Sequence, residues 1–405
     1  MLNFQVNEEK LTWHLAESSW EAEEIAAAIA VLSSGRITMG ERVAEFERAF
    51  AERLGVRYAI MTNSGSSANL LAVSALSHMS SLPGLEPGDE AIVPALAWAT
   101  TYAPLAQHGV KLRLIDVNLE TLNAEFPAYE AALEHGTALL VAVNILGNPC
   151  ESIPQLRKLC DQRGCYLLED NCESLGAEIH GYPAGTLAHV ATHSFFFSHQ
   201  LSTGEGGMLT TDDREIADLA RCLRAHGWAR DLEYDSPLFE RFGRAKDFQE
   251  AYRFLLPGYN LRPTEIAAAI GLVQLKRLDH LIAERRKNAA RFRAAFGGDE
   301  RFQLQRETGS SSWFGFTMVL REHWATGKCR SAAFGALRDT GIEFRPITGG
   351  DFTQHPAARS YHWEIDDSAK LANVGHLQGF GWFVGNHARD LSAEISLLKN
   401  ALSTI

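Results

Sequence analysis

The central segment of the chain reads SFFFSHQLSTGEGG over residues 194–207, and an apolar segment, LLED, precedes it at residues 167–170. Each segment begins with the apolar run that is typical of a buried strand, and each continues into polar or glycine-rich sequence. In an open α/β sheet, ligands bind beyond the carboxyl ends of the parallel strands. The sequence therefore predicts a site that includes Asp170 and His199.

Short apolar segments alternate with helical patterns on both sides of this site. Strands are expected at residues 58–61, 88–94, 111–117, 138–144, 192–197 and 208–211, and helices at 20–33, 41–54, 127–135 and 153–163. The alternation predicts βαβ units and a largely parallel sheet. In the first helix, Ile25, Ile29 and Leu32 have helical spacing, and we interpret it as a packing helix.

A long helix, expected over residues 264–296, separates this region from the C-terminal part of the chain. There a strand at 314–320 and a helix at 331–339 alternate again. The length of 405 residues and the 46% of hydrophobic residues suffice for two domains. We expect a large domain over residues 1–257, which includes the N-terminal helices. Residues 258–405 would then form the long helix and a small C-terminal α/β domain.

The composition argues against several classes of partner. A formal net charge of −12 disfavours a nucleic-acid-binding surface. The chain has no basic leader followed by an apolar core, and no uncharged apolar run reaches about 18 residues, the length of a membrane span. Its six cysteines lack paired or metal-ligand spacing and fit a reducing compartment. We expect a cytoplasmic protein without a metal site and without a nucleic-acid or membrane partner.

A second candidate element is a turn of small residues, TNSGSSANLL at residues 62–71, which lies between an apolar strand and a helical pattern. Backbone N–H groups at such a helix N-terminus bind phosphate. Taken alone, the turn is typical of an ordinary N-cap and Trp98 of a core residue, and Asp170 is equally consistent with a cap or a metal ligand. Ser194 alone is consistent with a half-exposed strand serine. Residues 205–207, Glu-Gly-Gly, are expected to form a tight turn because glycine tolerates a positive φ.

Together, and in this order, the motifs resemble the sugar-nucleotide aminotransferase family. Its members use pyridoxal phosphate (PLP) and have the aspartate-aminotransferase-like fold, PLP fold type I, so the resemblance implies that α/β fold here. The family signature is Asp, then Ser-Phe, then a lysine that bonds PLP, then Glu-Gly-Gly. All of it except the lysine is present, and counting back six residues from Glu205 places His199 at the lysine position. This exchange is similar to that in the dehydratase branch of the family.

The resemblance implies a role for each matching residue around the cofactor. Gly65 and Ser66 would hold the cofactor phosphate in the turn of small residues, and Ser194 would bond the same phosphate. Trp98 would stack on the pyridine ring. Asp170 would pair with the ring nitrogen and keep it protonated, so that the ring can accept electrons.

Further matches concern the substrate and a partner subunit. Glu173 would hydrogen-bond the ring hydroxyl or help to place the substrate. His226 and Arg230 lie in a segment similar to the substrate loop of the family, where they would bind the substrate. The alternative interpretation of that segment, without a functional role, is a solvated helix end. Arg345 lies in a segment similar to the dehydratase branch and is a third expected substrate-binding residue. Asn260 would reach the cofactor of a neighbouring subunit, which implies a homodimer with shared active sites.

A histidine in place of the lysine changes the chemistry of the site. Lysine forms a covalent bond with PLP, whereas imidazole does not but titrates near neutrality and moves protons. The dehydratase branch implies that L-glutamate converts PLP to pyridoxamine phosphate (PMP). The PMP form then removes the C3 hydroxyl of a 4-keto-6-deoxy sugar nucleotide, and ammonia is released. His199, Asp170 and Glu173 are the expected catalytic residues.

Three other interpretations are also consistent with the sequence. The first is an iron-sulfur-assisted 3-dehydrase, although the relevant cysteine cluster after His199 is missing. The second is a sugar aminotransferase that carries an engineered lysine-to-histidine change. The third is a non-catalytic regulatory protein that keeps the fold. The sequence also leaves the nucleotide open among GDP, CDP and dTDP.

Overall fold

The largest element of the structure is a central sheet of eight strands. The structure is a computed structural model that describes residues 11–134, 136–244, 248–365 and 371–404. The strands lie in the order β1 (Tyr58–Thr62), β9 (Gly207–Thr211), β8 (Val190–Ser194), β5 (Tyr166–Asp170), β4 (Thr137–Val143), β2 (Glu90–Pro94), β3 (Lys111–Ile115) and β13 (Trp363–Ile365). All pairs are parallel except those of β9, which is antiparallel to both neighbours. The prediction of a largely parallel sheet is therefore confirmed.

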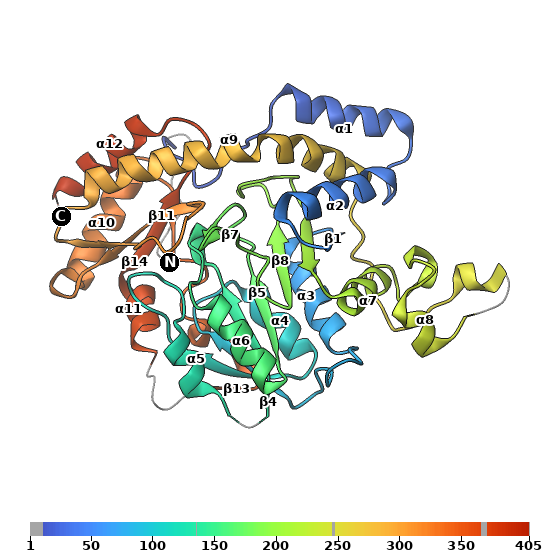
Figure 1. Ribbon diagram of the computed structural model, residues 1–405. Helices are drawn as coiled ribbons and strands as arrows, with labels where there is room; N and C mark the ends of the chain where they lie inside the picture. The colour runs from blue at the N-terminus through green and yellow to red at the C-terminus, as the bar shows by residue number, and fades with distance from the viewer. Residues whose placement is uncertain (1–10, 135, 245–247, 366–370, 405) are drawn as a thin grey trace.

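Helices lie on both sides of this sheet (Figure 1). In chain order they are α1 (Ala22–Ser34), α2 (Glu41–Leu54), α3 (Gly65–Leu76), α4 (Ala99–Gln107), α5 (Phe126–Ala132), α6 (Ile153–Arg163), α7 (Arg214–Arg224) and α8 (Pro237–Phe242). A short hairpin of β6 (Glu178–Ile179) and β7 (Tyr182–Pro183) precedes β8. Most boundaries agree with the expected ranges, but β8 ends at Ser194, so Phe195 to Phe197 do not extend the strand as predicted.

A smaller antiparallel sheet lies beside the larger one, below the C-terminal half of the long helix α9 (Glu265–Phe296), which runs across the top of the molecule (Figure 1). Its strands are ordered β10 (Phe302–Leu304), β11 (Gly315–Leu320), β14 (Gly381–Gly385) and β12 (Phe344–Arg345). The helices of this region are α10 (Gly327–Asp339), α11 (Ala372–Phe380) and α12 (Ser392–Ala401). The observed α9 confirms the predicted long helix.

Segments far apart in the sequence contribute to each of the two main cores. Trp13 is fully buried in the core of the smaller sheet, together with Phe292 and Phe316. In the opposite direction, β13 joins the larger sheet through β3, and Phe352 packs in the core of that sheet. The division at residues 257 and 258 therefore stays a prediction, and contacts cross it in both directions.

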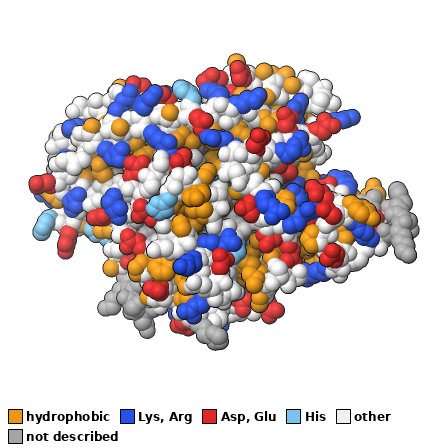
Figure 2. Space-filling model, in the orientation of Figure 1, with side chains coloured by type: hydrophobic (Ala, Val, Ile, Leu, Met, Phe, Trp, Pro, Cys, Tyr) orange, Lys and Arg blue, Asp and Glu red, His pale blue; other side chains and the backbone are white. Residues whose placement is uncertain are grey.

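Helix α1 does not pack as the spacing of its apolar residues predicts. Ile25, Ile29 and Leu32 have exposed fractions of 54%, 55% and 56%, and apolar side chains are visible over α1 at the upper edge of Figure 2. The helix instead turns Glu24 toward α9, where Gln274 Nε2 donates to it over 2.7 Å and Arg277 Nη1 lies 2.8 Å away. The helix therefore packs on α9, as interpreted, but through a face that includes Glu24 and not through this apolar stripe.

We predict that Trp13→Ala lowers the free energy of unfolding by about 3–5 kcal/mol, because it leaves a large cavity in a core to which no other residue of the described segment 11–21 contributes. Urea unfolding followed by circular dichroism measures the change. Tyr234→Ala is the control, since the exposed fraction of Tyr234 is 84%. A loss below about 1 kcal/mol for Trp13→Ala would show that the N-terminal segment is not anchored there.

Candidate active site

A pocket of about 590 Å³ opens at the carboxyl ends of β4, β5 and β8, where the smaller sheet faces the larger one. Its walls come from the N-termini of α3 and α4, from the turn after β5, from the loop after β8 and from the C-terminal region. The predicted residues that line it are Gly65, Ser66, Trp98, Asp170, Glu173, Ser194, His199 and Arg345. The fold thus gathers residues that are up to 280 positions apart into one cavity.

The turn of small residues forms the N-terminus of α3. Ser64 caps the helix by accepting from the N–H of Ser67 over 3.1 Å, and Ser66 Oγ donates to Thr100 Oγ1 over 2.9 Å. A Cβ at Gly65 would lie 2.5 Å from the Cβ of Ser194, so only glycine lets Ser194 lie against the turn. A helix N-terminus flanked by two serines is suited to an anion such as a phosphate.

The Glu-Gly-Gly motif supports this turn, although not in the predicted way. Neither Gly206 nor Gly207 has a positive φ, so the expected left-handed turn is wrong. Glycine is required because the chain passes too close to its neighbours: a Cβ at Gly207 would lie 2.3 Å from the carbonyl oxygen of Ser64, and one at Gly206 would lie 2.4 Å from Thr203 Oγ1.

Asp170 is buried at the end of β5, and donors from three elements orient its carboxylate. Oδ2 accepts from Asn69 Nδ2 over 2.9 Å and from Thr101 Oγ1 over 2.7 Å, while Oδ1 accepts from the N–H of Cys172 over 3.2 Å. Thr192 Oγ1 in turn donates to Asn69 Oδ1 over 2.6 Å, which fixes the amide orientation. The carboxylate is therefore held in one position on the floor of the pocket.

Glu173 also lines the pocket, three residues after Asp170. Its Oε2 accepts from the N–H of Leu146 over 2.8 Å, and Leu146 has the left-handed backbone conformation, with φ of 52°. Burial, assisted by the charge of Asp170, raises the pKa of Glu173 to about 7. This carboxyl can therefore both donate and accept a proton near neutral pH.

His199 lies on the loop between β8 and β9. Ser198 Oγ lies 3.3 Å from its Nδ1, and the rings of Phe196 and Phe314 meet the imidazole edge-to-face at centroid distances of 6.0 and 5.1 Å. Burial, and after it the charge of Arg285, lower the pKa of His199 to about 3. The imidazole is therefore neutral at pH 7 and able to accept a proton.

The apolar part of the pocket contains unusually exposed aromatic rings. Trp98 is 54% exposed, and Phe196 and Phe197 are 44% and 39% exposed. An exposed indole face at a pocket wall is suited to stacking on a flat ring.

Three predicted residues do not line this pocket. Asn260 pairs with Ala225 in an isolated bridge, and the N–H of His226 donates to Tyr259 over 2.6 Å. The Arg230 guanidinium lies over the ring of Trp228 at 4.2 Å. Asn260, His226 and Arg230 are exposed and lie in the segments that flank α8, between α7 and α9.

Sequence reasoning missed several residues that build the pocket. Asn69 and Thr101 fix Asp170, Phe314 contacts His199, and Leu15 lines the wall from the N-terminal segment. The sequence could have indicated Asn69, since it lies in the turn of small residues at 62–71. It could not have indicated Leu15 and Phe314, because only the tertiary fold brings them to the pocket.

The described residues offer neither a metal site nor a membrane-spanning helix. No group of three His, Cys, Asp or Glu side chains among them is arranged to hold a metal ion. Within the same ranges, no helix is long and apolar enough to cross a membrane. Positive and negative side chains are interspersed over the face shown in Figure 2.

Several known proteins are similar to this chain over nearly its whole length. GDP-4-keto-6-deoxy-D-mannose 3-dehydratase of Yersinia pseudotuberculosis is 40% identical over 395 residues, which cover 97% of this chain and 98% of the relative. Two solved structures of GDP-4-keto-6-deoxymannose 3-dehydratase, each 40% identical, superpose with a TM-score of 0.91 over 97% of this chain and 100% of theirs. One, from E. coli, holds hydrated PLP, and the other a trapped PLP-glutamate geminal diamine.

The family model that matches the chain covers nearly all of the two sheets and the pocket between them. It spans residues 18–373 and describes the DegT/DnrJ/EryC1/StrS aminotransferases. The fold is accordingly the aspartate-aminotransferase-like fold, PLP fold type I. With a match of this extent and relatives of 40% identity along the full length, the chain belongs to the DegT/DnrJ/EryC1/StrS aminotransferase family.

Proposed function

We propose that the protein is a PLP- and PMP-dependent 3-dehydratase of a 4-keto-6-deoxy sugar nucleotide in deoxysugar biosynthesis. L-Glutamate is the amino donor, and ammonia is released. The observation that carries the proposal is His199, a neutral imidazole that lines the pocket at the position of the lysine of the family. The 3-dehydratase relatives support it, and their names make a GDP-sugar the first substrate to test.

The residues present fit the proposed cofactor. The cradle beside Gly65 and Ser194 suits its phosphate, the exposed face of Trp98 suits its ring, and the oriented carboxylate of Asp170 suits a protonated ring nitrogen. When bound, the cofactor supplies an electron sink for the carbon that loses a proton. Glu173 is placed to bond the ring hydroxyl or the substrate.

His199 is the proposed proton carrier in both halves of the reaction. It is neutral at pH 7, and because Ser198 Oγ lies near Nδ1, we assign the transferred proton to Nε2. Asp170 contributes by holding a fixed negative charge where it keeps the ring nitrogen protonated. Arg345, 60% exposed at the mouth of the pocket, is proposed to bind the substrate.

The proposed assembly is a homodimer with shared active sites. Asn260, His226 and Arg230 lie outside the pocket of their own chain and are exposed, as residues that serve the pocket of a partner must be. The exposed apolar stripe of α1, with Ile25 and Ile29, is a surface that a partner subunit would cover. The cytoplasmic location inferred from the sequence stays a prediction.

The direct test is product analysis by mass spectrometry with L-glutamate and GDP-, CDP- and dTDP-linked 4-keto-6-deoxy sugars. We expect a 3-deoxy-4-keto product and ammonia, without any added electron donor. Activity that requires a reductant and iron would favour the reductive dehydrase, and a stable amino-sugar product would favour an aminotransferase. No turnover with any of the three nucleotides would favour the regulatory interpretation.

We predict that His199→Asn slows dehydration in a single turnover with PMP-loaded protein by about 10²–10⁴-fold, because a positioned acid–base group contributes that much. Rapid-quench sampling of the sugar product measures the rate. His280→Asn, on the exposed side of α9, is the control and should match the wild type. A wild-type rate for His199→Asn would move the role to another group, with Glu173 the next candidate.

A second prediction concerns the bond between protein and cofactor. Borohydride treatment of the wild-type protein with PLP should fix no cofactor on His199, since imidazole is not a primary amine. His199→Lys should give a covalent adduct at residue 199, located by peptide mass spectrometry. A fixed adduct on a native lysine of the wild type would contradict the assignment of His199 to the lysine position.

Asp170→Asn should impair both half-reactions to a similar extent, because the electron sink is used in each of them. Stopped-flow absorbance of the cofactor, with glutamate alone and then with sugar nucleotide and PMP, separates the two. Asp218→Asn, the same exchange at a buried carboxylate of α7 that does not line the pocket, controls for stability effects. If only one half-reaction slows for Asp170→Asn, the carboxylate has a narrower role than the one proposed here.

A further inference from the structure

Arg285 is a buried arginine of α9 that binds four main-chain carbonyls around His199. Its exposed fraction is 4%. Nη2 donates to the carbonyls of Ser198 and His199 over 3.3 and 3.5 Å, and Nη1 donates to those of Phe314 and Asn386 over 3.2 and 2.6 Å. One guanidinium therefore connects the loop of His199 with the two strand ends of the smaller sheet.

The charge of Arg285 has no compensating carboxylate. Within the described ranges, Arg285 forms no ion pair, and its Nε has no acceptor. Burial lowers the pKa of Arg285 to about 10, which still leaves it charged at pH 7. A buried cation without a counter-ion is costly, whereas a neutral amide would also donate to carbonyls at a smaller desolvation penalty. The position of this charge therefore calls for an explanation.

Two contacts transmit the position of Arg285 to the imidazole. The first is direct, through the carbonyls of residues 198 and 199 themselves. The second passes through Phe314, whose carbonyl accepts from Arg285 and whose ring meets the imidazole of His199 at 5.1 Å and 78°. Asn386 strengthens the arrangement, because its Nδ2 donates back to the carbonyl of Arg285 over 3.1 Å.

The positive charge also acts on the protonation of His199. A cation close to an imidazole disfavours the imidazolium form. The other charged groups that line the same pocket are Asp170, Glu173, Glu205 and Arg345. After burial itself, Arg285 is the group that lowers the pKa of His199. The three carboxylates would act in the opposite direction, so the cation behind the loop offsets the negative side of the pocket.

We propose that Arg285 is a positioning residue for His199: it fixes the loop and the Phe314 ring that hold the imidazole, and it places an uncompensated positive charge behind that imidazole. This inference rests on the role of His199 in the proposed function. It differs from a purely structural role, which would require the hydrogen bonds but not the charge.

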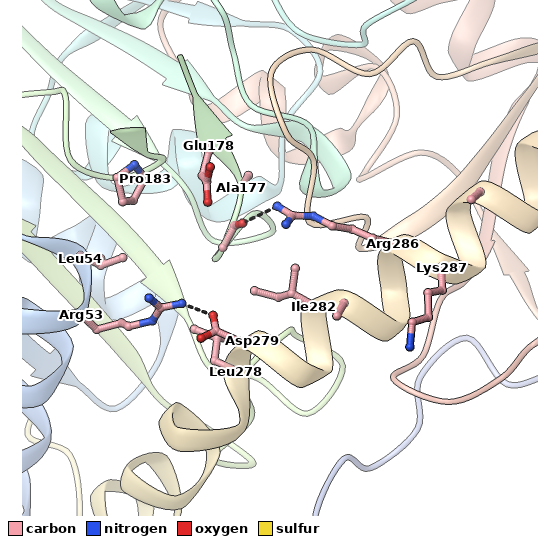
Figure 3. A pocket seen from close by; sticks show the side chains of 13 residues that line it. Arg53, Leu54, Ala177, Glu178, Pro183, Leu278, Asp279, Ile282, Arg286 and Lys287 are labelled. Atoms are coloured by element: carbon pink, nitrogen blue, oxygen red, sulfur yellow. Dashed lines mark hydrogen bonds and ion pairs between the residues drawn. The ribbon is translucent and has the colours of Figure 1, made fainter. Parts of the chain in front are cut away.

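The chain offers a matched control in the next residue of α9. Arg286 also donates to main-chain carbonyls, with Nε to Ser311 over 2.9 Å and Nη2 to Gly176 over 3.1 Å. It faces a different cavity, beside Ile282 and near the ion pair of Arg53 with Asp279 (Figure 3). Arg286→Gln therefore removes comparable contacts from the same helix without touching the loop of His199.

The test is the NMR titration of His199 in full-length protein without cofactor, with histidine labelled at Cε1 and the signal identified by its loss in His199→Asn. In the wild type we expect a midpoint at least one unit below about 6.5, the ordinary histidine value. Arg285→Gln should raise this midpoint by one unit or more, and Arg286→Gln should leave it unchanged. A wild-type midpoint at or above the ordinary value, or an unchanged midpoint in folded Arg285→Gln, overturns the proposal.

Arg285→Lys separates charge from geometry, because lysine keeps the charge but lacks the planar fork. We expect its midpoint to stay within about half a unit of the wild type, with single-turnover dehydration slowed about tenfold or more. A midpoint raised as far as in Arg285→Gln overturns the role of the charge. If Arg285→Gln is unfolded by circular dichroism, the wild-type and Arg285→Lys titrations decide. The titrations need no substrate, so a failed dehydratase assay and a failed inference are distinguishable.

Discussion

A buried carboxylate at the end of β5 determines how the pocket is built. Removing an ion from water costs several kcal/mol unless donors replace the lost hydration. For Asp170 these donors are Asn69 from α3, Thr101 from α4 and the N–H of Cys172. The N-termini of both helices must therefore converge on one side chain. The same convergence brings the turn at Gly65 and the ring of Trp98 into the pocket that holds the carboxylate.

The parts of this site that the sequence predicted are local ones. A strand that ends in a carboxylate, a turn of small residues before a helix, and the Glu-Gly-Gly spacing that marks His199 each lie within about ten residues of chain. The resemblance to a known family added their roles. Arg285 and Phe314 could not be found in this way, because they reach His199 from 86 and 115 residues further along the chain and leave no periodic pattern.

Helix α1 shows why a hydrophobic pattern alone did not identify its buried face. Its spacing correctly predicted a helix, but the residues that face α9 include Glu24, whose burial is compensated by Gln274, Arg277 and the N–H of Glu21. A charged residue with three donors is as acceptable in an interface as an apolar one. The periodicity therefore describes which side chains share a face, and the tertiary partners decide which face is covered.

The antiparallel strand β9 has a consequence for how the chemistry of such a pocket can change. Because β9 runs against β8, residues 195–206 form a hairpin loop whose two ends are hydrogen-bonded to each other, as in the pair of Ser194 with Gly207. A parallel neighbour would need a crossover of a dozen or more residues. A side chain exchanged at position 199 therefore alters a closed loop and leaves the sheet register as it is. A replacement at this one position can thus change the chemistry of the pocket while the sheet that carries the loop keeps its structure.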